Sequence, residues 1–340
     1  MMPSLGIIAN PASGKDIRRL VSYATIIDNQ EKVNIVKRLV LAAQSLGVDE
    51  VLFMPDSYHF GEVAMGELTA DRTLRASYEV MDLPIFATQE DTIRAAAEME
   101  RRHVGCIVVL GGDGTSRAVA KSVRDTPILP LSTGTNNTYQ EMIEGTVAGM
   151  AAGIIAGMED PSPHCIRDKR IEVRVNGRFR DIALIDAAIS DDLWVGARAI
   201  WNADDIGTVI VTRCSPASIG FSAAAGCHRV ILPTDDQGLA LELAGGSHAA
   251  RRGGGRRYRA PIAAGVLNEI EVLDSRELEL DEPYRIEAES DGMLAVDGER
   301  EVRIAKGDVL DFSITRNGPL RVLVRETLDQ AVDDNLFELR

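Results

Sequence analysis

The chain has 340 residues, of which 37 are Lys or Arg and 52 are Asp or Glu, so its net charge is −15. This excess of acid argues against a nucleic-acid-binding surface, which needs a basic footprint. The length and a hydrophobic content of 45% predict about two globular domains, each with its own core. No signal peptide or membrane helix is evident, and the four scattered cysteines are typical of a reducing compartment. We therefore expect a cytoplasmic protein without a membrane span.

The first part of the chain, residues 1–163, alternates short apolar strands with helical segments. One run, Cys106–Leu110, is continuously apolar and ends at two glycines, which is typical of a strand buried on both faces of a parallel sheet. This succession predicts an α/β domain whose ligand loops lie at the carboxyl ends of the strands. The predicted strands are Leu5–Ala9, Glu50–Met54, Cys106–Leu110 and Ile128–Leu131, and the predicted helices are Lys32–Leu46, Thr92–Arg102, Ser116–Val123 and Thr138–Gly157.

The composition changes after Asp160-Pro161-Ser162-Pro163. From Ile171 onward short β-type segments dominate, with turn signals such as Asp297-Gly298 between them. We predict that residues 164–325 form an all-β sandwich domain for substrate binding and oligomer contacts, and that the acidic tail, residues 326–340, is helical. The stretch Gly245–Ala260 carries five arginines, five glycines and no acid, and it is expected to be a mobile loop.

Three polar loops follow strands of the first domain, and all three are rich in Gly, Ser, Thr and Asn: the first is Asn10–Lys15, the second Gly111–Thr115 and the third Ser132–Asn137. Glycines let a backbone approach a phosphate closely, and the helices that follow the loops offer free N–H groups. Three such loops at corresponding ends of one sheet predict a nucleotide phosphate cradle. The candidate ligands are Asn10, Ser13, Gly14, Gly111, Gly112, Gly114, Thr115, Thr133, Gly134, Thr135, Asn136 and Asn137.

Asp113 lies in the second loop between glycines, so no bulky neighbour shields its carboxylate. Like charges repel, so it is not a direct phosphate ligand. It could accept the proton of a substrate hydroxyl, or help to hold Mg²⁺ that is bound to phosphate. The alternative is a turn aspartate that caps the helix at Ser116–Val123. The neighbouring glycines, Thr115 and the two companion loops favour the catalytic interpretation.

These motifs carry a resemblance to a known superfamily. Gly111-Gly112-Asp113-Gly114-Thr115 resembles the signature shared by NAD kinases, diacylglycerol and sphingosine kinases, and their bacterial relatives. The first loop is similar to the first nucleotide loop of the diacylglycerol kinase side, and Thr133–Asn137 to its later Gly-Thr-Gly-Asn loop. Val296-Asp297-Gly298-Glu299 resembles the late Asp-Gly turn of both branches. The whole pattern is most similar to the bacterial ATP-NAD kinase-like proteins found with acetoin catabolism genes.

The resemblance implies a kinase with an α/β domain that holds Asp113, a β-sandwich domain that covers it, and ATP with Mg²⁺ as the phosphoryl source. Asp113 would activate the accepting hydroxyl of NAD or a related small molecule, which would place the protein in NADP biosynthesis. The segment Ser215–Ala223 resembles a substrate segment of NAD kinases, which makes Ser215, Ser218 and Phe221 candidate substrate ligands. Family members assemble through their β domains, so a homo-oligomer is expected. No residue is assigned to a metal.

The sequence departs from NAD kinases at one informative place. Their dinucleotide-gripping Asn-Glu pair is matched here by Ile185-Asp186, so Asp186 is kept as a candidate substrate ligand while Ile185 cannot make the amide's hydrogen bonds. Three hypotheses therefore stay open: a kinase for NAD or a related compound with ATP or polyphosphate as donor, a lipid kinase of the diacylglycerol or sphingoid type, and an inactive nucleotide-binding regulator. The five arginines of Gly245–Ala260 are a further candidate, as a clamp for substrate phosphates, against a plain surface role.

Overall fold

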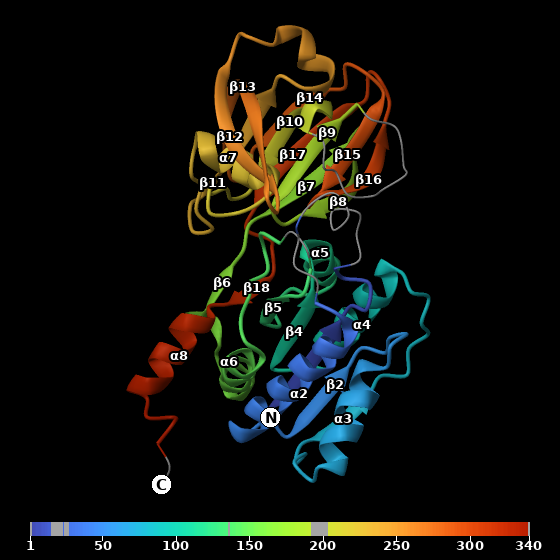
Figure 1. Ribbon diagram of the computed structural model, residues 1–340, viewed down its shortest axis with the longest axis vertical. Coiled ribbons are helices and arrows are strands. Elements are labelled where there is room, and N and C mark those ends of the chain that lie inside the picture. Colours follow the sequence, from blue (N-terminus) through green and yellow to red (C-terminus); the bar gives the residue numbers. More distant parts are fainter. Residues whose placement is uncertain (1, 15–22, 24–26, 135–136, 192–202, 339–340) are drawn as a thin grey trace.

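The computed structural model describes residues 2–14, 23, 27–134, 137–191 and 203–338. The described chain forms two lobes (Figure 1), one built on a largely parallel sheet with helices on both faces and one built of antiparallel sheets. The α/β domain and the all-β domain predicted from the sequence are both confirmed.

The first lobe contains a seven-stranded sheet in the order β3-β2-β1-β4-β5-β18-β6. Neighbouring strands from β3 to β18 are parallel, and only β6 runs antiparallel to its neighbour. The strand order reverses at β1, because β2 lies on one side of it and β4 on the other. A crevice forms at such a reversal, outside the carboxyl ends of the strands. The strands are β1 (Ser4–Ala9), β2 (Glu50–Phe53), β3 (Ser77–Val80), β4 (Cys106–Gly111), β5 (Ile128–Ser132), β6 (Cys165–Arg167) and β18 (Leu320–Val322).

Helices cover both faces of this sheet because its strands are apolar on both sides. Side chains such as Leu5 and Ile7 pack under α2 (Asn29–Ser45), α3 (Phe60–Ala70) and α6 (Gly145–Gly157). Ile8 points to the other face, under α4 (Gln89–Arg101) and α5 (Asp113–Ala120). Asp28 caps α2 by accepting a hydrogen bond from the Glu31 N–H at 2.8 Å, and a capping box between Thr88 and Asp91 begins α4.

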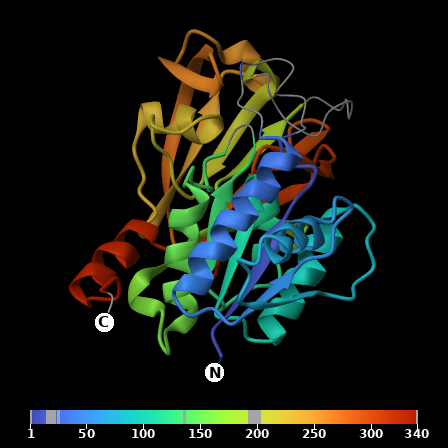
Figure 2. The ribbon, with the colours of Figure 1, turned by 60° about the horizontal axis from the view of Figure 1, so that its bottom comes forward.

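The pair α2 and α6 lies side by side on one face, with α8 (Val324–Asp333) next to α6 (Figure 2). Gly145, Gly149 and Gly153 recur every four residues along α6 and face α2. A Cβ at Gly149 would overlap the carbonyl oxygen of Leu39 on α2. Glycine is therefore required here for close approach of the two backbones.

The second lobe contains two antiparallel sheets, in the orders β12-β13-β11-β10-β9-β15-β16 and β14-β17-β7-β8. An apolar core that includes Val173, Ile210 and Phe312 fills the space between them. Helix α7 (Phe221–His228) packs on the opposite face of the larger sheet. The strands are β7 (Arg170–Val175), β8 (Arg178–Ala183), β9 (Asp186–Ser190), β10 (Ile206–Val211), β11 (Gln237–Leu243), β12 (Arg256–Ala263), β13 (Val266–Glu279), β14 (Pro283–Glu287), β15 (Gly292–Val296), β16 (Glu299–Ile304) and β17 (Val309–Thr315), and the short 3-10 helices are η1 (Ser162–His164), η2 (Ala203–Asp205) and η3 (Gly246–Arg251).

Several elements differ from the sequence-based expectation. The helix expected at Thr138–Gly157 begins only at Gly145, and α5 begins at Asp113 rather than at Ser116. Helix α3 and strand β3 were not predicted. The prediction of a mobile loop at Gly245–Ala260 is wrong. This stretch contains η3 and the first residues of β12, and these residues of β12 pair with β13. Although the expected second domain spanned residues 164–325, β6 and β18 hydrogen-bond into the first sheet.

Candidate active site

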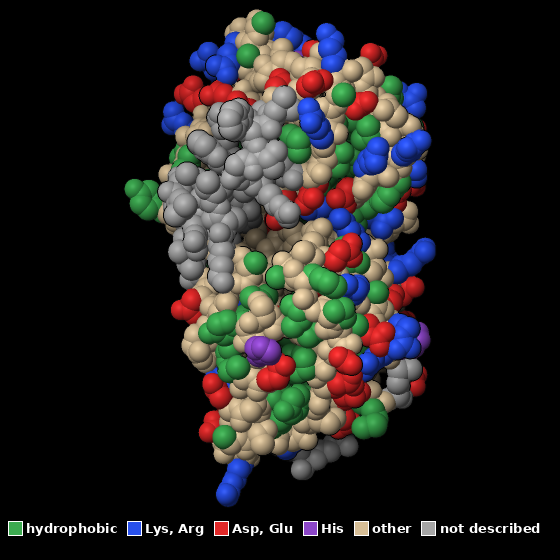
Figure 3. Space-filling view, turned by 90° about the vertical axis from the view of Figure 1, so that its right-hand side faces the viewer, with side chains coloured by type: hydrophobic (Ala, Val, Ile, Leu, Met, Phe, Trp, Pro, Cys, Tyr) green, Lys and Arg blue, Asp and Glu red, His purple; other side chains and the backbone are tan. Residues whose placement is uncertain are grey.

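A cavity of about 670 Å³ lies at the carboxyl ends of the first sheet and extends to the second lobe. Figure 3 shows the surface hollowed between the two lobes. The first-lobe lining comes from the three polar loops, from Met54–Ser57 after β2, and from residues 87–93 at the start of α4. The second lobe contributes Asp297, Glu299 and Glu301. This volume is in the range of small-molecule sites.

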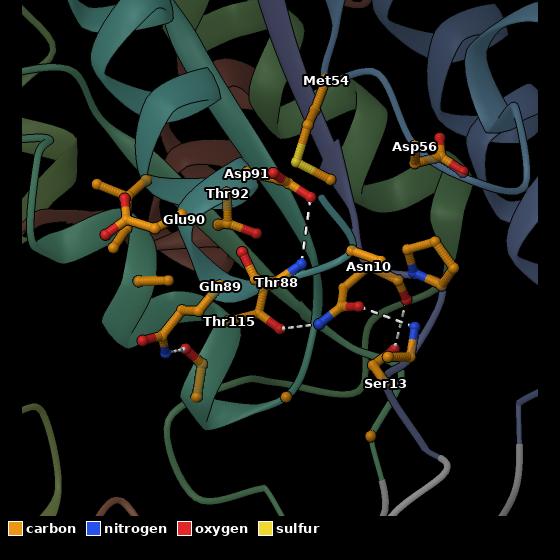
Figure 4. A pocket seen from close by; sticks show the side chains of 18 of the residues that line it. Asn10, Ser13, Met54, Asp56, Thr88, Gln89, Glu90, Asp91, Thr92 and Thr115 are labelled. Atoms are coloured by element: carbon orange, nitrogen blue, oxygen red, sulfur yellow. Dashed lines mark hydrogen bonds between the residues drawn. The ribbon is translucent and has the colours of Figure 1, made fainter. Parts of the chain in front are cut away.

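The three loops are joined to one another by hydrogen bonds. The Asn10 side-chain amide donates to Thr115 Oγ1 at 3.0 Å, as Figure 4 shows, and the Ser13 and Thr133 hydroxyls lie 3.0 Å apart. The Thr133 N–H donates to the Gly111 carbonyl at 2.9 Å. Gly134 approaches the second loop closely, since a Cβ there would lie 3.1 Å from the Gly112 Cα and 2.8 Å from the Asn137 side chain. The loops therefore form one continuous wall of the cavity.

A buried lysine from α2 supports the first loop. The Lys32 side chain is fully buried, and its ammonium group donates to the carbonyl oxygens of Asn10 and Ser13, both at 3.0 Å. In a trans peptide the N–H points opposite to the preceding carbonyl. Since the Ser13 carbonyl faces Lys32, the N–H of Gly14, which lines the cavity, is turned away from Lys32. Lys32 thus fixes the loop and brings a positive charge beneath it.

Asp113 is the first residue of α5 and lines the cavity. One carboxylate oxygen accepts a hydrogen bond from the Thr138 N–H at 2.9 Å, and the other accepts from the Tyr139 N–H at 3.0 Å. The carboxylate is therefore oriented by the backbone that follows the third loop.

The cavity wall of the second lobe centres on Asp297 in the turn between β15 and β16. Its carboxylate is fully buried and accepts hydrogen bonds from the backbone N–H groups of Leu184 at 3.0 Å and Ile185 at 2.8 Å. Burial raises the pKa of Asp297 to about 7; the Arg117 guanidinium opposes this rise, and the negative charge of Asp113 adds to it. Two carboxyl groups from different lobes therefore influence each other across the site.

Arg117 ties α5 to this wall. Its guanidinium is fully buried, donates to Asp181 at 2.9 Å and to Glu301 at 2.9 Å, and lies 3.4 Å from Glu299. Burial lowers the pKa of Arg117, but the negative charges of Asp297, Asp181, Glu301 and Glu299 hold this pKa above the ordinary value. Arg117 lies one helical turn after Asp113, so its ion pairs attach the helix that carries Asp113 to the second lobe.

The structure gathers most of the predicted phosphate ligands at this cavity. Asn10, Ser13, Gly14, Gly112, Gly114, Thr115, Gly134 and Asn137 line it together with Asp113. Gly111 and Thr133 lie behind this lining, where they join β4 to the third loop. Thr135 and Asn136 lie outside the described residues.

The four predicted substrate ligands lie elsewhere in the described part of the chain, and none of them lines the cavity. Phe221 is 4% exposed and packs in the apolar core under α7. The hydroxyl of Ser218 donates to the carbonyl of Ser215 and so shapes the turn before α7. Asp186 is buried, and its backbone carbonyl accepts a hydrogen bond from the Asp297 N–H at 2.8 Å. The arginines of Gly245–Ala260 are also absent from the cavity lining; Arg251, for example, pairs with Glu242 at 2.8 Å.

Sequence reasoning missed several groups at this site. Lys32 carries no local signal, because a lysine in the first turn of a helix is ordinary. Asp297 was noted only as a turn residue, and its position beside Asp113 depends on the packing of the two lobes. The segment at residues 87–93 belongs to a helix whose start was predicted at Thr92, so its contribution to the cavity could not be seen.

Comparisons with known proteins agree with this architecture. A model of the ATP-NAD kinase N-terminal domain matches residues 5–158, and a model of the acetoin catabolism protein X C-terminal domain matches residues 169–317. The crystal structure of yeast NADH kinase complexed with NADH matches with a TM-score of 0.53 and 15% identity, covering 100% of this chain and 89% of that chain. The fold is therefore that of the NAD kinase type, as the sequence motifs predicted.

A sequence relative identifies the family within this fold class. Acetoin catabolism protein X of Cupriavidus necator is 40% identical over 321 residues, which cover 92% of this chain and 88% of the relative. The chain belongs to the acetoin catabolism protein X family, and in it an NAD kinase-like first domain is followed by a domain that matches the C-terminal model of that family. Among the described residues, no helix is both long and apolar enough to span a bilayer.

Proposed function

We propose that the protein is a kinase that transfers the γ-phosphoryl group of ATP to a hydroxyl group of NAD or a related small molecule, with Asp113 as the general base. The observation that supports this most strongly is the convergence of three joined polar loops on one cavity that also contains the Asp113 carboxylate. Neutral donors suit phosphate oxygens, and a carboxylate beside them suits proton removal from an alcohol.

The triphosphate would lie against the loops and the start of α5. The first N–H groups of a helix lack partners within the helix, and its dipole favours an anion at that end. Gly112 and Gly114 leave the backbone accessible, and the Asn10 and Ser13 side chains are close by. Lys32 would add a positive charge beneath the loop without contacting the ligand.

A divalent cation fits this site as a companion of ATP. The described residues contain no cluster of three or more His, Cys, Asp or Glu side chains that could hold a metal alone. Mg²⁺ typically binds through one or two carboxylates and the substrate phosphates, so such a cluster is not required. Glu299, which faces the cavity from the second lobe, would supply a carboxylate oxygen. When bound, the cation neutralises phosphate charge.

In the proposed reaction the acceptor hydroxyl lies against Asp113. As its oxygen forms a bond to the γ-phosphorus, the bond from that phosphorus to the β–γ bridging oxygen breaks and ADP leaves. The hydroxyl proton moves to Asp113, whose carboxylate is held in place by the Thr138 and Tyr139 amides. A fixed base and a fixed phosphoryl group lower the barrier by positioning.

A nucleotide-binding regulator without turnover is the second candidate. One observation favours it: Ile185, at the place where NAD kinases carry an amide, is 1% exposed and packs in the core that joins the two lobes. This position therefore offers a ligand no polar group. An acceptor other than NAD would explain the same observation.

The decisive experiment is a phosphoryl-transfer assay with purified protein, Mg²⁺, labelled ATP or polyphosphate, and a panel of acceptors. The panel contains NAD, NADH, nucleosides, sugars and diacylglycerol, and Asp113→Asn is the negative control. Product from NAD supports the proposal, product from diacylglycerol supports a lipid kinase, and ATP binding without any product supports a regulator. We also propose a cytoplasmic homo-oligomer, which sedimentation equilibrium would test by its mass.

A further inference from the structure

The dipeptide Thr138-Tyr139 is connected to both lobes at once. Its two backbone N–H groups hold the two oxygens of Asp113. It lies between the third loop and α6, in a segment without regular secondary structure. Its side chains bind groups of the second lobe and of the junction between the lobes.

The Thr138 side chain binds the second lobe. Its hydroxyl donates to the Ile219 carbonyl at 3.1 Å and lies 3.3 Å from the Ser222 hydroxyl. Ile219 directly precedes the N-cap of α7 and Ser222 lies in its first turn; α7 packs on β10 and β12 of the larger sheet. A displacement of α7 would therefore be transmitted to the Thr138 backbone.

The Tyr139 side chain enters a buried ionic cluster. Its hydroxyl donates to Asp168 Oδ2 at 2.7 Å, and the Asp168 carboxylate also pairs with Arg321 at 2.8 Å and Arg213 at 2.7 Å. Both guanidinium groups lie over the tyrosine ring, with centroid distances of 5.1 Å for Arg213 and 5.9 Å for Arg321. Asp168 and Tyr139 are almost fully buried.

The cluster lies where the chain passes between the lobes. Asp168 follows β6 and precedes β7, and Arg321 belongs to β18, so both connections between the lobes meet here (Figure 1). Arg213 follows β10 in the second lobe. Any change in the angle between the lobes must therefore move the partners of the Tyr139 hydroxyl.

We propose that Thr138 and Tyr139 are positioning residues that couple the placement of the second lobe to the orientation of the Asp113 carboxylate. The inference rests on the proposed role of Asp113. Buried ionic groups often add little net stability, because desolvation offsets their attraction. Here the cluster instead fixes the dipeptide that orients the base, so the catalytic geometry forms only when the lobes are correctly docked.

The test removes each side-chain link and leaves the backbone amides in place. Thr138→Val loses the hydroxyl contacts to α7, Tyr139→Phe loses the hydrogen bond to Asp168, and Thr138→Ser keeps a hydroxyl as the conservative rescue. Hydrogen exchange of the amides at residues 138 and 139 should accelerate about tenfold or more in the first two variants and stay near wild type in the third. With the acceptor found above, kcat should fall about tenfold while the KM for ATP changes less than about twofold, because a small misplacement of a reacting group is costly.

Thr327→Val is the matched control. Thr327 is fully buried, whereas Thr138 is half-buried; the Thr327 hydroxyl donates one hydrogen bond, to the Leu323 carbonyl at 2.7 Å, and the residue lies in α8. This variant should lose comparable stability without changing exchange at residues 138 and 139 or kcat. Unchanged exchange in Thr138→Val and Tyr139→Phe would overturn the coupling, and so would faster exchange with unchanged kcat. If wild type phosphorylates no acceptor, the proposed function fails while the exchange data still decide the coupling.

Discussion

At the scale of single residues, the orientation of Asp113 predicts the effect of a neutral replacement. In Asp113→Asn the remaining side-chain oxygen can still accept one of the two backbone N–H bonds. The new NH₂ group faces the other backbone N–H and cannot accept from it. The side-chain amide also cannot take up the proton of a substrate hydroxyl. We expect kcat to fall about 10²- to 10⁴-fold, the usual contribution of a general base. Binding of MgATP, followed by calorimetry, should change only a few-fold, because the loop donors remain. Normal turnover would contradict the proposed mechanism.

Lys32 predicts a second residue-scale effect. Lys32→Met keeps the length of the side chain but leaves the buried carbonyls of Asn10 and Ser13 without their donor, which costs about 1–3 kcal/mol for a buried polar group. The free energy of unfolding in urea should fall by that amount, and the KM for ATP should rise. Lys37→Met is the control on the same helix, because Lys37 forms a partly exposed pair with Glu67, worth about 0–1 kcal/mol. Equal losses in both variants would contradict a special role for Lys32.

Asp297 predicts a pH dependence of stability. Its pKa in the folded protein, about 7, lies above the ordinary value of 3.8, so between these values the folded state binds a proton that the unfolded state has lost. Its contribution is complete below pH 3.8 and is lost as the pH rises through about 7. From pH 5 to pH 7, wild type should therefore lose about 2 kcal/mol more stability than Asp297→Asn. Urea unfolding at several pH values measures this, and parallel pH profiles would refute it.

These residues also mark what the sequence could predict at the site. The three loops were predictable because glycines and small polar residues directly follow apolar strands, and parallel strands bring such loops to one edge. Lys32, Arg117 and Asp297 were not, because each acts through partners that are distant in sequence and that only tertiary packing brings close. Phe221 was predicted to bind substrate because its segment resembles a family motif, but its ring packs in the apolar core.

At the scale of elements, the contact between α2 and α6 predicts opposite effects for two glycine substitutions. Gly149→Ala adds a Cβ that would overlap the Leu39 carbonyl, so the helices must separate, and overpacking of this kind costs about 1–3 kcal/mol. Gly66→Ala, inside α3, meets no atom within 4 Å and should stabilise the protein by about 0.5–1 kcal/mol, because alanine favours the helix. Thermal unfolding distinguishes the two. Equal shifts would contradict the packing argument.

The same scale shows where pattern and structure differ. The apolar strands β1, β4 and β5 were predictable from continuous hydrophobic runs. The extra helix expected at Thr138–Glu144 does not form, because Glu141 pairs with β5: its carbonyl accepts a hydrogen bond from the Ser132 N–H at 2.9 Å and its N–H donates to the Pro130 carbonyl at 3.4 Å. Tertiary pairing therefore overrides the local helix propensity here. The arginine-rich part of β12 was misassigned because its partner strand β13, not its own composition, decides its conformation.

At the scale of the whole molecule, the two lobes are joined by two chain connections rather than one. After β6 the chain builds the second lobe, and it returns through β18, which lies between β5 and β6 in the first sheet. A change of composition near residue 163 indicates where the second lobe begins, but three residues such as Leu320–Val322 carry too little pattern to show which sheet they join. Both chain connections of the second lobe are therefore held in the first sheet, and buried ionic clusters lie between the lobes.

This return predicts that the end of the chain stabilises the beginning. Deletion of residues 318–340 removes β18 and α8, exposes the edge of β5 and removes Val322 and Arg321 from the first lobe and the interface. Amide exchange should therefore accelerate in β1, β4 and β5, while β7 to β17, which lie within residues 170–315, stay protected. Deletion of residues 334–340 alone, beyond the end of α8, is the control and should leave both lobes unchanged. If the longer deletion loosened the second lobe and spared the first, β18 would not hold the first sheet together.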